Sequence, residues 1–535
     1  MYDLVEFEKA GIPCVEIPTE AFESEAQQRA IGQGLPTIAS AAVPTEVSYL
    51  TELSEIHEIA DAAMPEIIAS LTAATEPMER RSAEPKIITI TPKEGEDILE
   101  AVNRYFFPPE NRWSDGFPVI PPTEERVEWM LTGTERSPDE EITQLPPCYG
   151  KATVEKIAIN AVMAGAKPEY LETIIAAVDA ISDPKVYLEG TTTTTDPGNA
   201  PLIVINGPIV NELGLNYSWG VMGPGWRPNS TIGRALSLCV RNIGGADTPG
   251  SIVQHTYYLP HDYSMVLAQP YPETTGNWKL LSEQLGYRRD QNVVFVMPTD
   301  GPTNLSPFDS PTKPISAANL LKNWVDQMAQ QQPRRGFVGL INFSPEHVRI
   351  LAAEGWTETD VKYYIFHTAF SPAVLEAKET GYTTRGEKHR ADTFGLTRMM
   401  KKPPVENCIV SGEDPVRDTF VLVSGAIPMG GHGNMIPRSS HGGYAAREIG
   451  TLAPPPARPE ELVEIETLPV EETTTEIECL KYGHYWYGEA CHEKPEDYEE
   501  EVPTPEEAPS EEEAPTPTPE ETPEEEEEEH YESVC

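Results

Sequence analysis

Short apolar runs alternate with longer amphipathic stretches along most of the chain. The apolar runs mostly end in glycine, proline, asparagine or serine, which is typical of buried strands followed by turns. They are PLIVING, NVVFVMP, FVGLINF, ENCIVSG and TFVLVSG. The amphipathic stretches have helical periodicity and include EGEDILEAVNRYF, TVEKIAINAVMAG, KPEYLETIIAAVDAI, STIGRALSLCVRNIG, AANLLKNWVDQMAQQ and SPEHVRILAAEG. This alternation predicts an α/β fold but does not reveal the order of the strands.

The first 75 residues show the same alternation on a smaller scale. A helix ends near Gly11, the strand CVEI follows, and Thr19 is placed to cap the helix EAFESEAQQRAIG. A second strand, TIASAAVP, precedes the long helix LSEIHEIADAAMPEIIASLT. We therefore expect residues 1–75 to form a small parallel α/β domain.

Changes in composition divide the remaining chain. Residues 76–86 are expected to form a linker, residues 87–451 a large α/β domain, and residues 452–535 a tail dominated by Glu, Pro and Thr. Such a tail buries too little apolar surface to offset its ordering entropy, so we expect it to be disordered. The Tyr-rich patch CLKYGHYWYGEACH is an exception that could dock on a surface. Its Cys and His residues suit zinc, but their spacing is not that of a standard finger.

The chain has a formal net charge of −48. From Glu460 onward, 29 acidic residues face only Lys481 and Lys494, which gives −27 and leaves −21 for the preceding residues. This charge disfavours nucleic acid and anionic membrane surfaces as partners. The start of the chain lacks a secretory signal, no apolar run is long enough to span a bilayer, and the seven cysteines are sparse. We expect a cytoplasmic protein that binds a small-molecule substrate, a basic protein through its tail, and a second copy of itself.

The loop GVMGPGWRPNSTIGRAL leads into a strong helix. Asn229 or Ser230 is expected to cap this helix, whose free N–H groups and positive dipole end would attract an anion. Arg227 and Arg234 could then clamp a carboxylate or phosphate. The alternative is an ordinary capped helix whose arginines pair with acidic neighbours. The loop matches neither a P-loop nor a GxGxxG motif.

Asn206 ends the apolar run Leu202–Ile205. Ligands of open α/β sheets bind outside the carboxyl ends of strands, so Asn206 is a candidate substrate-binding residue. The alternative is an ordinary strand exit.

The stretch LVSGAIPMGGHGNMIPRSSHGG is expected to leave a strand and form a Gly-rich loop. It carries His432 and His441, which we consider as general acid–base residues because an unperturbed histidine titrates near neutrality. The two histidines would be only part of a metal site, which His255, His261 or Asp262 would have to complete.

Cys148 precedes a helix N-terminus, where a thiolate would be stabilised, and is a third catalytic candidate. Trp113, Asp115 and the segment PVIPP either line a pocket or form a structural turn. Cys14, Cys239 and Cys408 are expected to be structural. The sequence identifies no nucleotide, flavin or haem site, so the cofactor stays unknown.

The stretch FEKAGIPCVEIPTEAFESEAQQRAIGQGLPTIASAAVP resembles the UGSC family of selenoproteins and their cysteine homologues. It is also distantly similar to the EKAGIP segment of glycine- and betaine-reductase-type selenoproteins. DGFPVIPPT, ATVEKIAINAVMAGAKPEYL and NSTIGRALSL resemble segments that accompany this domain in longer members.

The resemblance implies a Sec-Gly-Ser-Cys or Cys-Gly-Ser-Cys motif upstream of the helix before Gly11. The chain contains no Cys-x-x-Cys, and the expected position lies before Met1. We expect an upstream start, with a selenocysteine codon read as a stop, and a thiol- or selenol-type oxidoreductase acting on a small, anionic substrate. Two alternatives stay open: a metal-dependent hydrolase or lyase using the His432/His441 loop, and a non-enzymatic scaffold with an acidic tail.

Overall fold

The computed structural model describes two compact units of the chain, Met1–Ala457 and Arg458–Cys535. The residues that it describes are 4, 7–8, 10–23, 26–27, 30, 35, 38–50, 52–72, 87–107, 113–147, 149–188, 190–191, 199–246, 265–271, 278–306, 316–331, 338–368, 419–425, 432–437, 442–451, 485–487 and 490–492. The predicted linker, the strand ENCIVSG and most of the predicted disordered tail lie outside these residues.

The N-terminal segment contains the parallel strand pairing that its sequence predicts. Glu16 bridges Ser40 and Thr19 bridges Val43, both in parallel orientation. Short 3-10 turns at η1 (Glu20–Phe22) and η2 (Thr45–Tyr49) follow these bridges, and α3 (Leu53–Thr72) completes the segment. Thr19 occupies the N-cap position of η1, but its side chain makes no capping hydrogen bond, contrary to expectation.

Helices and strands alternate through the large domain, which confirms the α/β prediction. The helices are α4 (Ile98–Phe106), α5 (Glu124–Leu131), α6 (Val154–Ala164), η4 (Pro168–Tyr170), α7 (Leu171–Ile181), α8 (Ile209–Glu212), α9 (Arg227–Asn242), α10 (Leu281–Gln284), α11 (Ala317–Gln331), α12 (Pro345–Ala353) and α13 (Glu358–Thr368). The strands are β1 (Glu141–Leu145), β2 (Gly150–Thr153), β3 (Ala200–Asn206), β4 (Val266–Ala268), β5 (Val293–Thr299), β6 (Thr303–Leu305), β7 (Val338–Phe343), β8 (Phe420–Val423), β9 (Gly433–Pro437) and β10 (Ala445–Glu448).

Local sequence signals explain several of these boundaries. The Asp97 side chain accepts from Leu99 N at the start of α4, Thr153 accepts from Lys156 N at α6, and Ser344 accepts from His347 N at α12. Gly165 ends α6 with a φ of 80°, a left-handed conformation that glycine adopts without steric cost.

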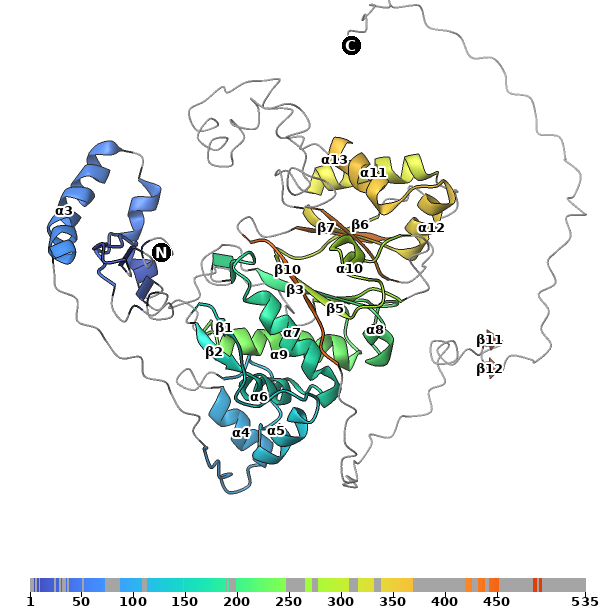
Figure 1. Cartoon of the computed structure of the whole chain (residues 1–535), viewed down its shortest axis with the longest axis horizontal. Helices are drawn as coiled ribbons and strands as arrows, with labels where there is room; N and C mark the ends of the chain where they lie inside the picture. The colour runs from blue at the N-terminus through green and yellow to red at the C-terminus, as the bar shows by residue number, and fades with distance from the viewer. Residues whose placement is uncertain are drawn as a thin grey trace, which may run out of the picture. The chain divides into compact units, whose positions relative to one another are not determined.

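The large domain contains two four-stranded mixed sheets with orders β10-β5-β3-β4 and β6-β9-β7-β8. Alternate side chains of β3 point to opposite faces: Ile203 and Ile205 join a core with helices, whereas Leu202 and Val204 join a core shared with the second sheet. The second sheet uses Ile341 and Phe343 in the same way against its own helices. Because both faces are buried, the strands are continuous apolar runs. The domain is thus a four-layer α/β/β/α sandwich (Figure 1).

The longer described helices cover the outer face of each sheet, whereas short α10 contributes Leu281 to the core between the sheets. α6, α7 and α9 contribute buried residues to the core on the first sheet, and α11, α12 and α13 cover the second (Figure 1). A smaller antiparallel pair, β1 with β2, adjoins the first helical layer.

The two sheets repeat one pattern of pairing. In each sheet a strand lies between a parallel and an antiparallel neighbour, and the antiparallel neighbour carries a fourth, antiparallel strand. Residues that meet across the first sheet are Val266, Ile203, Val296 and Ala445. The corresponding residues of the second are Val421, Ile341, Met435 and Thr303. The fourth strand of each sheet comes from a part of the chain that otherwise builds the other sheet. β6 follows β5 of the first sheet in the chain but pairs in the second sheet, and β10 follows β9 of the second sheet but pairs in the first.

β9 corrects one sequence expectation. Residues 433–437 were expected in a Gly-rich loop, yet they form a buried strand between β6 and β7. Gly433 is required by packing, because an added Cβ would lie 2.4 Å from the Trp324 ring. The glycine therefore permits close contact rather than loop mobility.

The second unit is described at β11 (Tyr485–Tyr487) and β12 (Ala490–His492), which pair antiparallel. Trp486 faces Cys491 in this pairing, within the Tyr-rich patch that differed from the rest of the tail. Across the described part of both units, no helix combines the length and apolar character that crossing a membrane requires.

Candidate functional site

The predicted substrate-binding helix, α9, begins three residues earlier than expected. Trp226 occupies the N-cap position and Arg227 is the first helical residue. Pro228 fits within the first turn because the N–H that it lacks would have no helical partner there. Asn229 and Ser230 therefore lie inside the helix and neither is its N-cap. Ser230 is half-buried, and its backbone N donates to Trp226 O at 3.1 Å.

Asn229 is buried, and its amide is used within the fold. Its Oδ1 accepts from Asn216 N at 2.8 Å, and its Nδ2 donates to Asn216 O at 3.1 Å and Val266 O at 3.2 Å. These bonds attach the first turn of α9 to the preceding loop and to β4.

Arg234 is held by an acidic neighbour. Its Nε and Nη2 each donate to the Asp115 carboxylate at 2.8 Å, and Nη2 also reaches Phe117 O and Pro118 O. The guanidinium further lies 5.9 Å from the centre of the Phe117 ring. Asp115 thus belongs to a structural turn, and Arg234 anchors that turn to α9.

Arg227 differs from Arg234 in its exposure. It is exposed at the start of α9, where its Nε donates to Gly165 O at 3.0 Å. It lies on the same helical face as Thr231 and Arg234, because residues four and seven apart share a face. A ligand that approaches this end of α9 would meet the Arg227 side chain.

Asn206 lies at the carboxyl edge of the first sheet, as predicted, but is fully buried. Its Nδ2 donates to Gln269 Oε1 at 3.0 Å, and its Oδ1 accepts from Ser282 N at 3.1 Å. Gln269 Oε1 also accepts from Leu281 N at 2.9 Å, which fixes the orientation of the Gln269 amide. This network ties β3, β4 and α10 together.

His432 is exposed just before β9, and its Nδ1 shares a hydrogen bond with Ser306 Oγ. His441, Cys148 and the proposed metal contributors His255, His261 and Asp262 lie outside the described residues. Within the described part of the chain, no group of three His, Cys, Asp or Glu side chains is arranged to hold a metal. Cys239 is buried in α9, as expected, and burial raises the pKa of its thiol.

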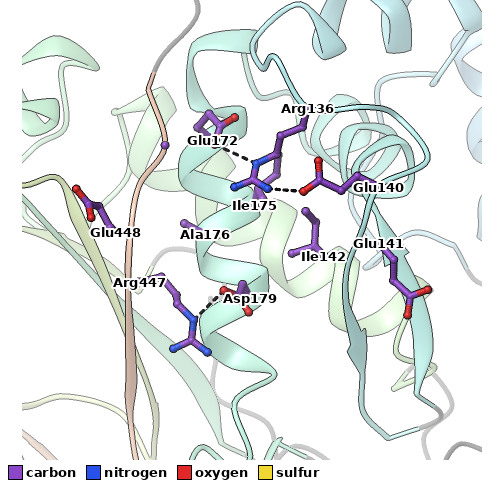
Figure 2. Close-up of a pocket in the computed structure, with 11 residues that line it drawn as sticks. Arg136, Glu140, Glu141, Ile142, Glu172, Ile175, Ala176, Asp179, Arg447 and Glu448 are labelled. Carbon is purple, nitrogen blue, oxygen red and sulfur yellow. Dashed lines mark hydrogen bonds and ion pairs between the residues drawn. The ribbon is translucent and has the colours of Figure 1, made fainter.

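A pocket that the sequence did not predict lies among the segment before β1, the start of β1, α7 and β10 (Figure 2). Its volume is about 170 Å³. Its lining combines two arginines, five carboxylates and a small apolar floor: Arg136, Glu140, Glu141, Ile142, Glu172, Ile175, Ala176, Asp179, Arg447, Glu448 and Gly450. Glu172 and Asp179 are seven residues apart on one face of the otherwise apolar α7. This spacing of two carboxylates on an apolar helix is the sequence feature from which the pocket could have been predicted.

Carboxylates neutralise both arginines of this pocket. Arg136 pairs with Glu140 at 2.6 Å and with buried Glu172 at 3.7 Å near the start of α7 (Figure 2). Arg447 pairs with Asp179 at 2.7 Å and Asp183 at 3.2 Å near the end of that helix. Burial alone would lower the pKa of Arg447, but these two carboxylates outweigh it and raise the pKa.

The excess of carboxylates decides which ligands suit the pocket. With two guanidinium groups against five carboxylates, the pocket attracts cationic or hydrogen-bond-donating groups and repels anions. This pocket therefore does not suit the small anionic substrate that the sequence predicts from Arg227 and Arg234.

Comparison with known proteins adds evidence for the N-terminal segment. Residues 1–73 match the model of the UGSC family. A search of curated proteins finds no match. The match covers the parallel bridges Glu16–Ser40 and Thr19–Val43 and the whole of α3. Residues 1–73 therefore form a UGSC-type domain.

Proposed function

We propose that the protein is a thiol- or selenol-type oxidoreductase acting on a small molecule. The match of residues 1–73 to the UGSC family carries this proposal. In this family a selenol or thiol followed by Gly-Ser-Cys would supply the nucleophile, and the resemblance places that motif ahead of the helix that ends near Gly11.

The chemistry of such a motif is a two-electron exchange. A selenolate or thiolate is stabilised at a helix N-terminus and attacks an electrophilic substrate. The second cysteine then displaces the adduct and forms an Se–S or S–S bond, so the substrate gains two electrons and two protons. A dithiol reductant would restore the reduced motif.

The large domain would bind the substrate. Arg227 is the side chain that supports this role best, because it is charged, exposed and located at the positive end of the 16-residue helix α9. Arg234 supports it less, since Asp115 and two backbone carbonyls engage its guanidinium. An anionic group on the substrate would thus be recognised by Arg227.

The test compares two proteins made from the same gene. One is the chain of 535 residues, and the other is expressed from the native locus together with the DNA immediately upstream, in a host that inserts selenocysteine. Each is alkylated before and after treatment with a dithiol, and its intact mass is measured. The control variants Cys14→Ser and Cys239→Ser identify alkylation at the two described cysteines.

We expect the native-locus product to contain a reducible bond that gains two alkyl groups after dithiol treatment and that the 535-residue chain lacks. Arg227→Ala should then raise KM for an anionic electrophile without changing the reducible bond. A native-locus product that starts at Met1 and contains no reducible bond would overturn the thiol/selenol mechanism.

A further inference from the structure

The pocket beside α7 has charged positions at both ends and apolar positions between them. Glu172, Ile175, Ala176 and Asp179 follow one another at helical spacing, so they lie on one face of α7. The two acidic residues are separated by roughly 10 Å along the helix axis, and the two apolar residues lie between them (Figure 2). Ile142 of β1 adds a further apolar side chain to the lining.

The Glu172 carboxylate has an oxygen for which the fold supplies no hydrogen-bond donor. The side chain is only 6% exposed, and its Oε1 accepts from Thr134 Oγ1. Its Oε2 accepts no hydrogen bond from the described residues, since Arg136 Nε lies 3.7 Å away, beyond hydrogen-bonding distance. An added Cβ on Gly450, which also lines the pocket, would lie 2.3 Å from this oxygen, so the glycine leaves it accessible. A buried carboxylate oxygen without a donor is costly, and this one points to a ligand that donates hydrogen bonds.

Each end of the pocket carries one excess negative charge. At each end one arginine is shared by two carboxylates: Arg136 by Glu140 and Glu172, and Arg447 by Asp179 and Asp183. Of the other carboxylates in the lining, Glu141 pairs with Lys151 at 2.8 Å, and Glu448 adds to the negative charge. A ligand with a cationic group at each end would therefore match the pocket better than a ligand with one cation.

The volume of the pocket limits the size of this ligand. The volume is about 170 Å³. Because a cavity of about 150 Å³ holds benzene, a ligand of roughly six to eight non-hydrogen atoms fits. An amino acid of this size carries a carboxylate, which the excess negative charge would repel. A metal ion does not suit the site either, since no three carboxylates in the described part of the chain converge as metal ligands.

We propose that this pocket binds a linear aliphatic diamine with a chain of about four to six methylene groups. One ammonium group would donate to Glu172 Oε2 and to Glu140, and the other would donate to Asp179. The methylene chain would lie on Ile175 and Ala176 and cover the apolar floor. The bound diamine would hold together the segment before β1, α7 and β10. This site is separate from the one proposed for the anionic substrate at the start of α9.

Hydrogen–deuterium exchange of the full chain, measured by mass spectrometry of its peptides, tests this site because it reports on the pocket separately from the acidic tail. The probe is cadaverine at millimolar concentration, and the ligand control is pentylamine, which has the same carbon chain but one amine. Asp179→Asn removes one charge from the pocket, and Ala176→Leu fills its floor without changing the charge. The matched control, Glu155→Gln, removes an exposed carboxylate from α6. Circular dichroism verifies that each variant keeps its helices.

We expect cadaverine to slow exchange in peptides covering residues 136–142 and 445–450 at least about three-fold, and pentylamine to have little effect. Asp179→Asn and Ala176→Leu should remove this protection, and Glu155→Gln should keep it. Unchanged exchange in the wild type with cadaverine would overturn the proposal. So would equal protection by pentylamine, or protection that persists in Ala176→Leu, because a general attraction of cations to an acidic chain would then explain the binding.

Discussion

Substitution of Arg234 tests whether this side chain stabilises the fold or is free to bind a ligand. Arg234 makes two bonds of 2.8 Å to Asp115 and reaches the carbonyls of Phe117 and Pro118 at 3.2 and 3.1 Å. The Arg234 and Asp115 side chains are 15% and 19% exposed, between a surface pair and a buried one. Surface pairs contribute up to about 1 kcal/mol, whereas breaking buried pairs costs about 3–5 kcal/mol.

We therefore expect Arg234→Ala to lower the free energy of unfolding by about 3 kcal/mol and Asp115→Ala by about 2 kcal/mol. The second value is smaller because Arg234 keeps its two carbonyl partners. Since the variants remove the same contact, the double variant should cost about 3 kcal/mol rather than the sum. Arg227→Ala is the matched control: Arg227 lies on the same helix but has one hydrogen bond at an exposed position, so its loss should cost below about 1 kcal/mol.

Urea unfolding followed by tryptophan fluorescence measures these differences, because midpoint shifts multiplied by the slope m give the change in free energy. Equal costs for Arg234→Ala and Arg227→Ala would refute the anchoring role. So would full additivity of Arg234→Ala and Asp115→Ala. Arg234 would then again be a candidate for binding substrate.

Three further predictions follow from local contacts. Because burial raises the pKa of Cys239 and shields its thiol, iodoacetamide should alkylate half-buried Cys14 and spare Cys239 in the native protein, as peptide mass spectrometry would show; equal alkylation would contradict this. The side-chain hydrogen bond from Arg104 lowers the pKa of Glu96 from 4.5 to about 2, so its stabilising effect is complete above pH 4.5 and is lost as the pH falls toward 2. The difference in urea midpoint between wild type and Glu96→Gln should shrink over this range, and a constant difference would exclude the pair as its cause. Gly133→Ala should lower the free energy of unfolding by about 2–3 kcal/mol, because the new Cβ would lie 2.0 Å from Pro168 O. Gly214→Ala is the matched control: its new Cβ would meet open space, so only the φ of 64° should lower the free energy of unfolding, by about 1 kcal/mol in the same assay.

Local sequence patterns predicted which segments form helices and strands better than they predicted where those segments begin or which strands pair. Thr153, Ser344 and Gly165 mark helix ends that the structure reproduces. The start of α9 was misplaced because Asn229 and Ser230 are both good capping residues, whereas the helix starts at Arg227 and tolerates Pro228. Composition alone could not show that Asn229 is buried and hydrogen-bonded to Asn216 and to Val266 of β4.

The sheet order could not be predicted because it depends on pairs far apart in sequence. Ala445 meets Val296, and Thr303 meets Met435. Neither β6 nor β10 has a long apolar run, so periodicity does not identify them as strands. The charged pocket was missed for the same reason, since Arg447 reaches Asp179 only once β10 lies beside β5.

The repeated pairing of the two sheets gives Asn206, at the end of β3, a counterpart in the second sheet. Counting from the equivalent residues Ile203 and Ile341, Asn206 corresponds to Ser344. Ser344 accepts from the backbone N of His347 at the start of α12, and Asn206 accepts from the backbone N of Ser282 at α10. Both residues thus use a side-chain oxygen to hold the first turn of a helix, although α12 directly follows β7 whereas α10 lies far along the chain from β3. The hydrogen bonds of Asn206, Asn229 and Arg234 hold the sandwich together, whereas Arg227 projects from it. Its exposed guanidinium is therefore the group that we propose for binding an anionic substrate.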